Sequence, residues 1–161
     1  MGDSREILTW EEFGRAGRAL AQGVWDSGFR PEVIVCIARG GLIPGGAVAY
    51  ALDVKSLLMV NVEFYTGVGE TLSKPRLVDA IPEQPTLNGK RVLIVDDVAD
   101  SGETLEFVTQ LCRERTDEVK VAVLYQKPRS CIDADFVWKR TDKWIAFPWS
   151  AAPAIAPPAA G

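Results

Sequence analysis

The stretch "VLIVDDVADSGETL", from Val92 to Leu105, sets three carboxylates between an apolar run and a glycine turn. Its first four residues are apolar, which is typical of a strand buried on both faces of a parallel sheet. Asp96 and Asp97 follow at the carboxyl end of that strand, where ligands bind in α/β sheets. The turn "ADSGET" then opens a helix, whose first N–H groups attract an anion. The stretch therefore predicts acceptors for hydroxyls or a cation beside donors for a phosphate, as a sugar phosphate requires.

The same residues have two other interpretations. Paired aspartates at a strand end, and Asp-Ser-Gly before a helix, are common turn and N-cap chemistry. A phospho-receiver domain also has paired acids at a strand end, but it needs an acceptor aspartate after another strand. The run "VIVCIA" (Val33–Ala38) is instead followed by Arg39. A Walker loop is excluded because no Gly-Lys-Ser/Thr sequence occurs.

Strand and helix patterns alternate around this stretch. Thr9 and Glu12 form a capping box that begins an amphipathic helix. The alternation predicts an α/β fold with a mainly parallel sheet flanked by helices. The expected helices cover residues 9–29, 47–53 and 103–115, and the expected strands cover 33–38, 56–65, 76–81, 91–97 and 119–127.

Three segments depart from the alternation. "TGVGETLSKPR" (66–76) is polar and Gly-rich, and we expect a mobile surface loop or hairpin tip. Residues 127–149 are expected to form a small aromatic hood over the sheet's edge, because three of the five tryptophans fall there. Residues 150–161 are rich in Ala and Pro and are expected to be a disordered tail. A single domain of residues 1–149 would precede that tail.

The composition narrows the classes of function. A net charge of −4 gives no support for nucleic-acid binding, and the absence of histidine excludes Ser-His-Asp and Cys-His catalysis. The three cysteines are far apart and form no Cys-x-x-Cys motif, as in a reduced cytoplasmic protein. No apolar run approaches the roughly 20 residues of a membrane helix, and the first ten residues contain no signal-peptide core.

A known signature matches the central stretch. Val92–Leu105 closely resembles the phosphoribosyl-pyrophosphate (PRPP) signature of type I phosphoribosyltransferases: a hydrophobic strand, two acids, a spacer and a Thr/Ser-Gly-x-Thr loop. "ARGGLIPG" (38–45) resembles the pyrophosphate loop of the xanthine-guanine and hypoxanthine members. "QKP" (126–128) and "WIAFPW" (144–149) resemble their base-binding segments. The resemblance therefore implies the type I phosphoribosyltransferase fold.

The resemblance implies a donor site. Asp96 and Asp97 would hold the ribose hydroxyls directly or through Mg²⁺, with Asp97 as the metal ligand. Asp100 resembles the general base near purine N7, a task that suits a carboxylate because the base loses a proton as N9 bonds to the sugar. Otherwise Asp100 is an N-cap-type acid. Ser101 stands where many members have threonine, and it keeps the hydroxyl. The implied PRPP-binding set is Arg39, Gly40, Asp96, Asp97, Asp100, Ser101, Gly102, Glu103 and Thr104.

Pyrophosphate contacts are expected from two places. Arg39 and Gly40 fall in a loop that in the family often contains a non-proline cis peptide; as a plain turn, this loop would leave Arg39 solvated. Lys74 and Arg76 would close over the pyrophosphate as part of a lid. Basic residues on such a loop are more often ordinary surface.

A base site is implied by three residues. Lys127 resembles the lysine that donates to the purine 6-oxo group, Trp144 the aromatic that stacks on the base, and Ile145 supplies backbone contacts to its far edge. The alternative is a small aromatic core, which we favour for Trp138 and Trp149.

These features predict an enzyme of purine salvage that transfers the 5-phosphoribosyl group from PRPP to N9 of a 6-oxopurine and releases pyrophosphate. The sequence does not rank guanine, xanthine and hypoxanthine. Adenine is disfavoured, because Lys127 would face its 6-amino donor and not an oxo acceptor. The alternative is a non-catalytic regulator of the same fold that senses PRPP or a nucleotide, and the complete acid and loop set argues against it. The resemblance also implies a homodimer or homotetramer.

Overall fold

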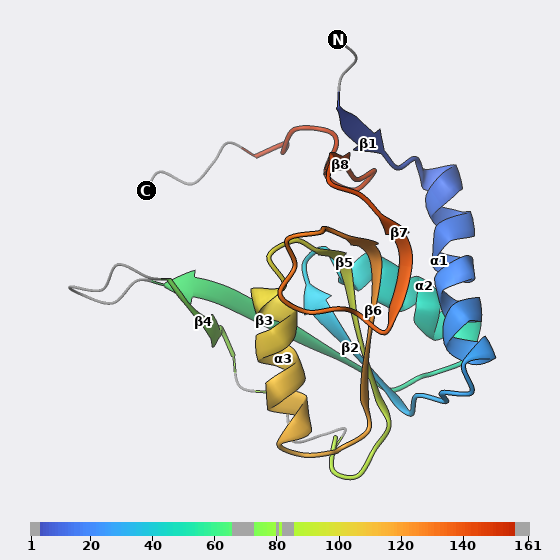
Figure 1. Cartoon of the computed structure of the whole chain (residues 1–161), viewed down its shortest axis with the longest axis vertical. Coiled ribbons are helices and arrows are strands. Elements are labelled where there is room, and N and C mark those ends of the chain that lie inside the picture. The colour runs from blue at the N-terminus through green and yellow to red at the C-terminus, as the bar shows by residue number, and fades with distance from the viewer. Residues whose placement is uncertain (1–3, 66–72, 80, 82–85, 157–161) are drawn as a thin grey trace.

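Helices and strands alternate along most of the chain (Figure 1). A computed structural model describes residues 4–65, 73–79, 81 and 86–156. In chain order the elements are β1 (Arg5–Ile7), α1 (Trp10–Asp26), β2 (Val33–Ala38), α2 (Leu42–Leu52), β3 (Leu57–Tyr65), β4 (Lys74–Leu77), β5 (Val92–Ala99), α3 (Glu103–Arg113), β6 (Val119–Gln126), β7 (Phe136–Arg140) and β8 (Trp144–Ala146).

Six strands form the main sheet in the order β4-β3-β2-β5-β6-β7. Among the described residues of this sheet only the β3–β4 pair is antiparallel, so the expected α/β fold with a mainly parallel sheet is confirmed. From β2 the chain crosses to β3 on one side, and from β5 it crosses to β6 on the other. The loops after β2 and β5 therefore diverge at a topological switch point, where α/β proteins bind ligands.

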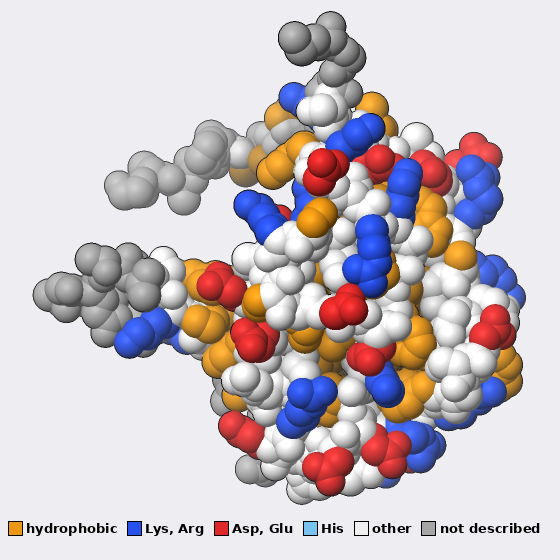
Figure 2. Space-filling view, in the orientation of Figure 1, with side chains coloured by type: hydrophobic (Ala, Val, Ile, Leu, Met, Phe, Trp, Pro, Cys, Tyr) orange, Lys and Arg blue, Asp and Glu red, His pale blue; other side chains and the backbone are white. Residues whose placement is uncertain are grey.

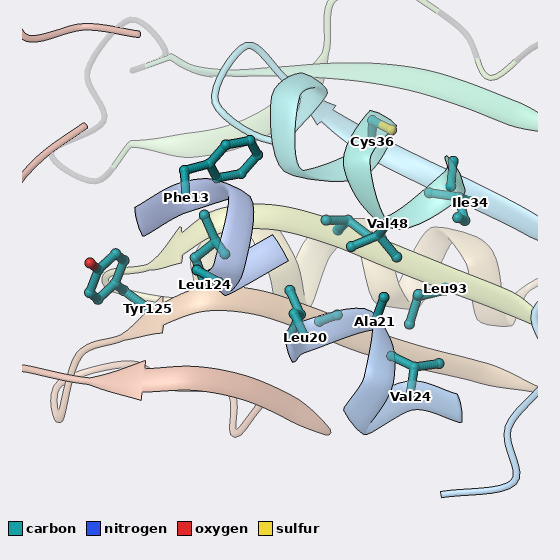
Figure 3. Packing of buried hydrophobic residues seen from close by; sticks show 14 of the residues in the cluster. Phe13, Leu20, Ala21, Val24, Ile34, Cys36, Val48, Leu93, Leu124 and Tyr125 are labelled. Carbon is teal, nitrogen blue, oxygen red and sulfur yellow. The ribbon is translucent and has the colours of Figure 1, made fainter. Parts of the chain in front are cut away.

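Both faces of the central strands are buried. Alternate residues of each strand point to opposite faces, so Ile34 and Leu93 pack under α1 and α2, whereas Val35 and Ile94 pack under α3. Figure 3 shows the first of these layers, in which Phe13, Leu20 and Val24 of α1 belong to one cluster of buried side chains with residues of the sheet. This double burial explains why the strands read as continuous apolar runs rather than alternating ones.

The first long helix begins where the capping pattern predicts. Thr9 Oγ1 accepts a hydrogen bond from the Glu12 N–H at 3.1 Å and satisfies one of the unpaired donors of α1. Phe13 and Leu20 are buried on the inner face. Trp10 is 57% exposed, because it lies in the first turn at the rim, where its ring meets Trp149 at 6.0 Å.

The C-terminal region differs from the expected hood. Within residues 127–149, β7 is a parallel edge strand of the main sheet, and its backbone hydrogen-bonds to the free edge of β6. Only β8 leaves the sheet, and it pairs in parallel with β1, which the sequence patterns did not predict. In the tail, residues 151–156 are exposed, and 157–161 lie outside the described residues.

The expected mobile segment is partly a strand. Lys74 and Arg76 belong to β4, which pairs antiparallel with β3, so this end of residues 66–76 is one arm of a hairpin. The order of pairing, with Lys74 opposite Tyr65 and Arg76 opposite Glu63, fixes the arm against β3. Residues 66–72 lie outside the described residues.

We expect Gly45→Ala to lower the free energy of unfolding by about 1–3 kcal/mol, the usual cost of overpacking. A Cβ at Gly45 would lie 2.3 Å from the sulfur of the buried Cys36 side chain, so that side chain or α2 would have to shift within a packed core. The matched control is Gly46→Ala on the same helix, where a Cβ meets nothing within 4 Å. It should raise stability by up to about 1 kcal/mol. Urea denaturation measures both, and equal effects would contradict the packing argument.

Candidate active site

The acid pair lies inside a strand rather than after it. Pairing between β2 and β5 ends at Cys36 and Val95, whereas β5 continues to Ala99 along β6. The strand expected at residues 91–97 therefore contains both acids, and it runs two residues further than expected, to Ala99, because β6 still supplies a hydrogen-bond ladder there. The two acids lie just beyond the last residues that β2 and β5 share, at the opening between the two loops.

Burial dominates the electrostatics of the acid pair. Asp96 is only 9% exposed, and the Asp97 N–H donates to its Oδ1 at 2.8 Å. Burial, and then the charge of Asp97, raise the pKa of Asp96 well above its usual range. Burial also raises the pKa of Asp97, while side-chain and backbone hydrogen bonds, one of them from Trp149, act to lower it. Two carboxylates in this position favour a ligand that supplies hydroxyls or positive charge.

The glycine loop after β2 packs directly on this pair. The peptide bond between Ala38 and Arg39 is cis, as the resemblance implied for this loop. A Cβ at Gly40 would lie 2.2 Å from Asp97 Oδ2, and one at Gly41 would lie 2.5 Å from the carbonyl oxygen of Val95. Only glycine permits this approach of backbone to carboxylate. The structure thus brings Gly40 and Asp97, 57 positions apart in the sequence, into contact.

The turn after β5 leads into α3 as the sequence predicts. Gly102 has φ +82°, a left-handed conformation that favours glycine. Ser101 Oγ accepts from the Glu103 N–H at 3.3 Å, and α3 begins at Glu103, with Thr104 in its first turn. The N–H groups of this first turn point out of the helix toward a potential anion.

A cavity of about 430 Å³ lies beside the turn, with Lys127 and Trp144 in its wall. The Trp144 side chain is 72% exposed, whereas Ile145 next to it is buried. Lys127 Nζ donates to the carbonyl oxygens of Asp142, at 3.4 Å, and Lys143. These bonds fix the ammonium group at the cavity. The lining residues are Lys127, Pro128, Arg129, Asp142 and Trp144.

Sequence reasoning missed two contacts of the acids. Arg129 donates from Nε to Asp100 Oδ1 at 2.7 Å, across 29 positions of sequence. Trp149 lies in an aromatic cluster, stacked on Phe147 at 4.9 Å, and acts to lower the pKa of Asp97. The only signal for Arg129 was its place two residues after Lys127, and none linked Trp149 to the acids.

The proposed lid residues are not brought to the site in this conformation. Two strands, β3 and β2, separate β4 from β5. Arg76 Nη2 lies 3.6 Å from Glu63 Oε2 on the neighbouring strand, and both side chains are more than half exposed. The lid role of Lys74 and Arg76 therefore stays a prediction.

Other classes of site receive no support within the described residues. No group of three or more Cys, Asp or Glu side chains there could hold a metal by itself. None of the described helices combines the length and apolarity of a membrane span. On the face shown in Figure 2, basic and acidic side chains are interspersed, without a continuous basic surface of the kind that binds nucleic acid.

Comparison with known proteins agrees with this geometry. The family model "Phosphoribosyl transferase domain" matches residues 3–155. A xanthine-guanine phosphoribosyltransferase of Gluconobacter oxydans is 33% identical over 153 residues, covering 94% of this chain and 88% of its own length. The solved purine phosphoribosyltransferase of Pyrococcus horikoshii is 38% identical with a TM-score of 0.81, over 96% of this chain and 99% of that one. A Neisseria gonorrhoeae protein solved with bound ppGpp is 28% identical with a TM-score of 0.81, over 94% of this chain and 92% of that one.

The chain therefore belongs to the phosphoribosyltransferase family. The resemblance carried by Val92–Leu105 is confirmed, as is the prediction of an enzyme that transfers phosphoribosyl groups to purines. The acid pair, the glycine loop after β2 and the turn before α3 therefore lie together beside the cavity that Lys127 and Trp144 line.

We expect Asp96→Asn to stabilise the ligand-free protein at pH 7, because the carboxyl group is harder to ionise in the folded state than in the unfolded state. Burial raises the pKa of Asp96 in the folded protein, so the folded state binds this proton more tightly than the unfolded state, in which the pKa is about 4. Wild-type stability therefore falls as the pH rises above about 4, and the variant lacks this loss.

Thermal unfolding at several pH values measures the effect. Asp117→Asn, at an exposed position, is the control and should change nothing. A variant that is less stable than wild type at pH 7 would show that Asp96 is favourably ionised in the folded protein.

Proposed function

We propose that the chain transfers the 5-phosphoribosyl group from PRPP to N9 of a 6-oxopurine, which is guanine, xanthine or hypoxanthine, and releases pyrophosphate. One observation carries the proposal. The acid pair, the glycine loop and the phosphate-binding turn meet at one switch point, directly beside a cavity walled by Lys127 and Trp144. A sugar phosphate donor and a flat base need these two neighbouring sites.

The donor half of the site would hold PRPP by its three groups. The ribose hydroxyls donate to Asp96 and Asp97, the 5′-phosphate accepts from the N–H groups of 101–104, and the pyrophosphate lies at Arg39 and Gly40. Lys74 and Arg76 would add positive charge when the hairpin closes. Catalysis then consists mainly of positioning the donor and of stabilising the charge that develops on the leaving pyrophosphate.

Magnesium fits this donor half. Mg²⁺ is usually held by one or two carboxylates together with substrate phosphates, rather than by a full protein cage. Asp97 suits this role better than Asp96, because Asp96 is the more buried of the two. When bound, the ion would neutralise charge on the leaving pyrophosphate.

The base half would read the purine from three directions. Lys127 has three N–H donors, of which two go to backbone carbonyls, and the third is directed to the 6-oxo group. Trp144 stacks on the ring, and the backbone at Ile145 meets the far edge. As N9 bonds to C1′ and the bond from C1′ to pyrophosphate breaks, Asp100 accepts the proton from N7.

We also propose a cytoplasmic enzyme that acts as a homodimer or homotetramer. Cys36, Cys112 and Cys131 are all free thiols, which suits a reducing compartment. Tyr50 on α2 and Met59 on β3 are exposed apolar side chains of the kind that subunits cover.

A second candidate is nucleotide binding without turnover. The Neisseria gonorrhoeae relative solved with bound ppGpp favours it, because the same turn and cavity could take a guanine nucleotide. Binding of ppGpp together with no product from any purine would support this candidate.

The deciding experiment is a product assay with PRPP, Mg²⁺ and each purine, on wild type and Asp100→Asn. We expect nucleoside monophosphate from the oxopurines, and a fall in kcat of about 10²–10⁴-fold in the variant, the usual value of general-base catalysis. PRPP affinity should be nearly unchanged. Arg129→Ala breaks the ion pair but keeps the Asp100 carboxylate, so it separates loss of the Arg129 contacts from loss of the base. A variant with near wild-type kcat would remove Asp100 from the mechanism.

The base half is tested by Lys127→Ala and Trp144→Ala, assayed as kcat/KM on four purines. Lys127→Ala should cost the oxopurines about 1.5–3 kcal/mol, a charge-assisted hydrogen bond, and narrow the gap to adenine. Trp144→Ala should weaken every purine by about 1–3 kcal/mol of stacking. Equal losses for adenine and the oxopurines in Lys127→Ala would show that Lys127 does not read the 6-position.

A further inference from the structure

The segment that follows β6 lies along the turn that follows β5, residue by residue. The Lys127 N–H donates to the Ala99 carbonyl at 2.9 Å, and the Cys131 N–H donates to the Ser101 carbonyl at 2.7 Å. Between them, Arg129 holds the carboxylate of Asp100. One short segment therefore contacts the last residue of β5 and the first two residues of the turn, and three of its own residues line the cavity.

Gly102 extends this contact. A Cβ there would lie 2.5 Å from Ser130 Oγ and 3.0 Å from the Cys131 nitrogen. The turn thus comes as close to the segment as backbone allows, and Gly102 also needs its positive φ. Because Gly102 packs against Ser130 and Cys131, these two residues determine where the first N–H groups of α3 lie.

A buried glutamine holds the segment in place. Gln126, the last residue of β6, is 6% exposed and lies opposite Ala99 in the β5–β6 ladder. Its Nε2 donates to Asp133 Oδ1 at 2.9 Å, and its Oε1 accepts from the Ala134 N–H at 2.9 Å. A side chain amide of this size, buried with both ends satisfied by one loop, fixes that loop to the sheet.

We propose that residues 127–134 form a brace that positions the phosphate-binding turn, and that Gln126 is the positioning residue that sets the brace. The geometry is independent of any reaction, and only the identity of the ligand rests on the proposed function. Because Lys127 and Arg129 also wall the cavity, the brace contacts the phosphate-binding turn and forms part of the cavity wall. The side-chain hydrogen bonds of Gln126 go to Asp133 and Ala134 and not to the turn or the cavity wall.

The test exchanges donor and acceptor at the two ends of one bond. Gln126→Glu replaces the donor with a carboxylate facing Asp133, and keeps the acceptor for Ala134. Adding Asp133→Asn returns a donor to the pair, so the double variant restores the bond in reverse. Arg140, whose Nη2 lies 3.0 Å from Asp133 Oδ1, is exposed and stays in each variant.

Two readouts are measured at pH 8: hydrogen exchange of the 100–105 segment in the ligand-free protein, and the Kd for guanosine 5′-monophosphate by calorimetry. In Gln126→Glu we expect exchange in that segment to be faster and Kd to rise about tenfold, which corresponds to roughly 1.4 kcal/mol. The double variant should recover most of both. The first readout needs no turnover, so it decides on the brace even if no purine is a substrate.

Asp135→Ala is the matched control, because it tests whether a loss of stability by itself changes the two readouts. Asp135 belongs to the same connection but accepts from the Val121 N–H at 2.8 Å, near the start of β6. It should lower the melting temperature and leave exchange at 100–105 and Kd unchanged.

The proposal is overturned if Gln126→Glu changes neither readout, or if the double variant fails to restore them. If Gln126→Glu does not fold, Arg129→Ala decides, because its side chain is 71% exposed and its loss removes only one contact of the brace. It should speed exchange at 100–105, and unchanged exchange there would overturn the proposal.

Discussion

The burial of Asp96 beside Asp97 is the constraint on which the rest of the site depends. Two carboxylates largely withdrawn from water lose hydration and repel each other. The chain keeps them there because β5 is paired on both sides as far as Val95 and on one side to Ala99. The backbone of Gly40 then closes on Asp97, leaving no room for a side chain. A ligand that brings hydroxyls or a cation to the pair would offset this cost.

The proposed base site is assembled from distant parts of the chain. Trp144 and Ile145 belong to β8, whose partner is β1 near the other end of the sequence. Trp149, close after β8, packs on Phe13 of α1 at 5.3 Å and acts to lower the pKa of Asp97. The aromatic residues near the C-terminus therefore include both core side chains, such as Trp149, and an exposed cavity wall, Trp144.

Much of this arrangement could be predicted from local patterns. The run after Val92, the glycine at position 102 and the cap at Thr9 each have a local physical cause, and each lies where the patterns placed it. The errors have a common cause as well. The end of β5, the place of β7 and the β1–β8 pair all depend on whether a neighbouring strand continues. The hydrophobic pattern of one strand does not show which other strand it will hydrogen-bond to, or how far that pairing extends.

The sequence by itself determined the α/β class, the acid pair before a helix-opening turn, and the family. These follow from residues that are close together along the chain, where period, capping and glycine conformation are local properties. Only the tertiary structure decided that β2 and β5 are neighbours, that Arg129 meets Asp100, and that Gln126 holds the segment against the turn. Each of those contacts depends on strand order and register, which are fixed when the two apolar layers pack and cannot be read from either partner alone.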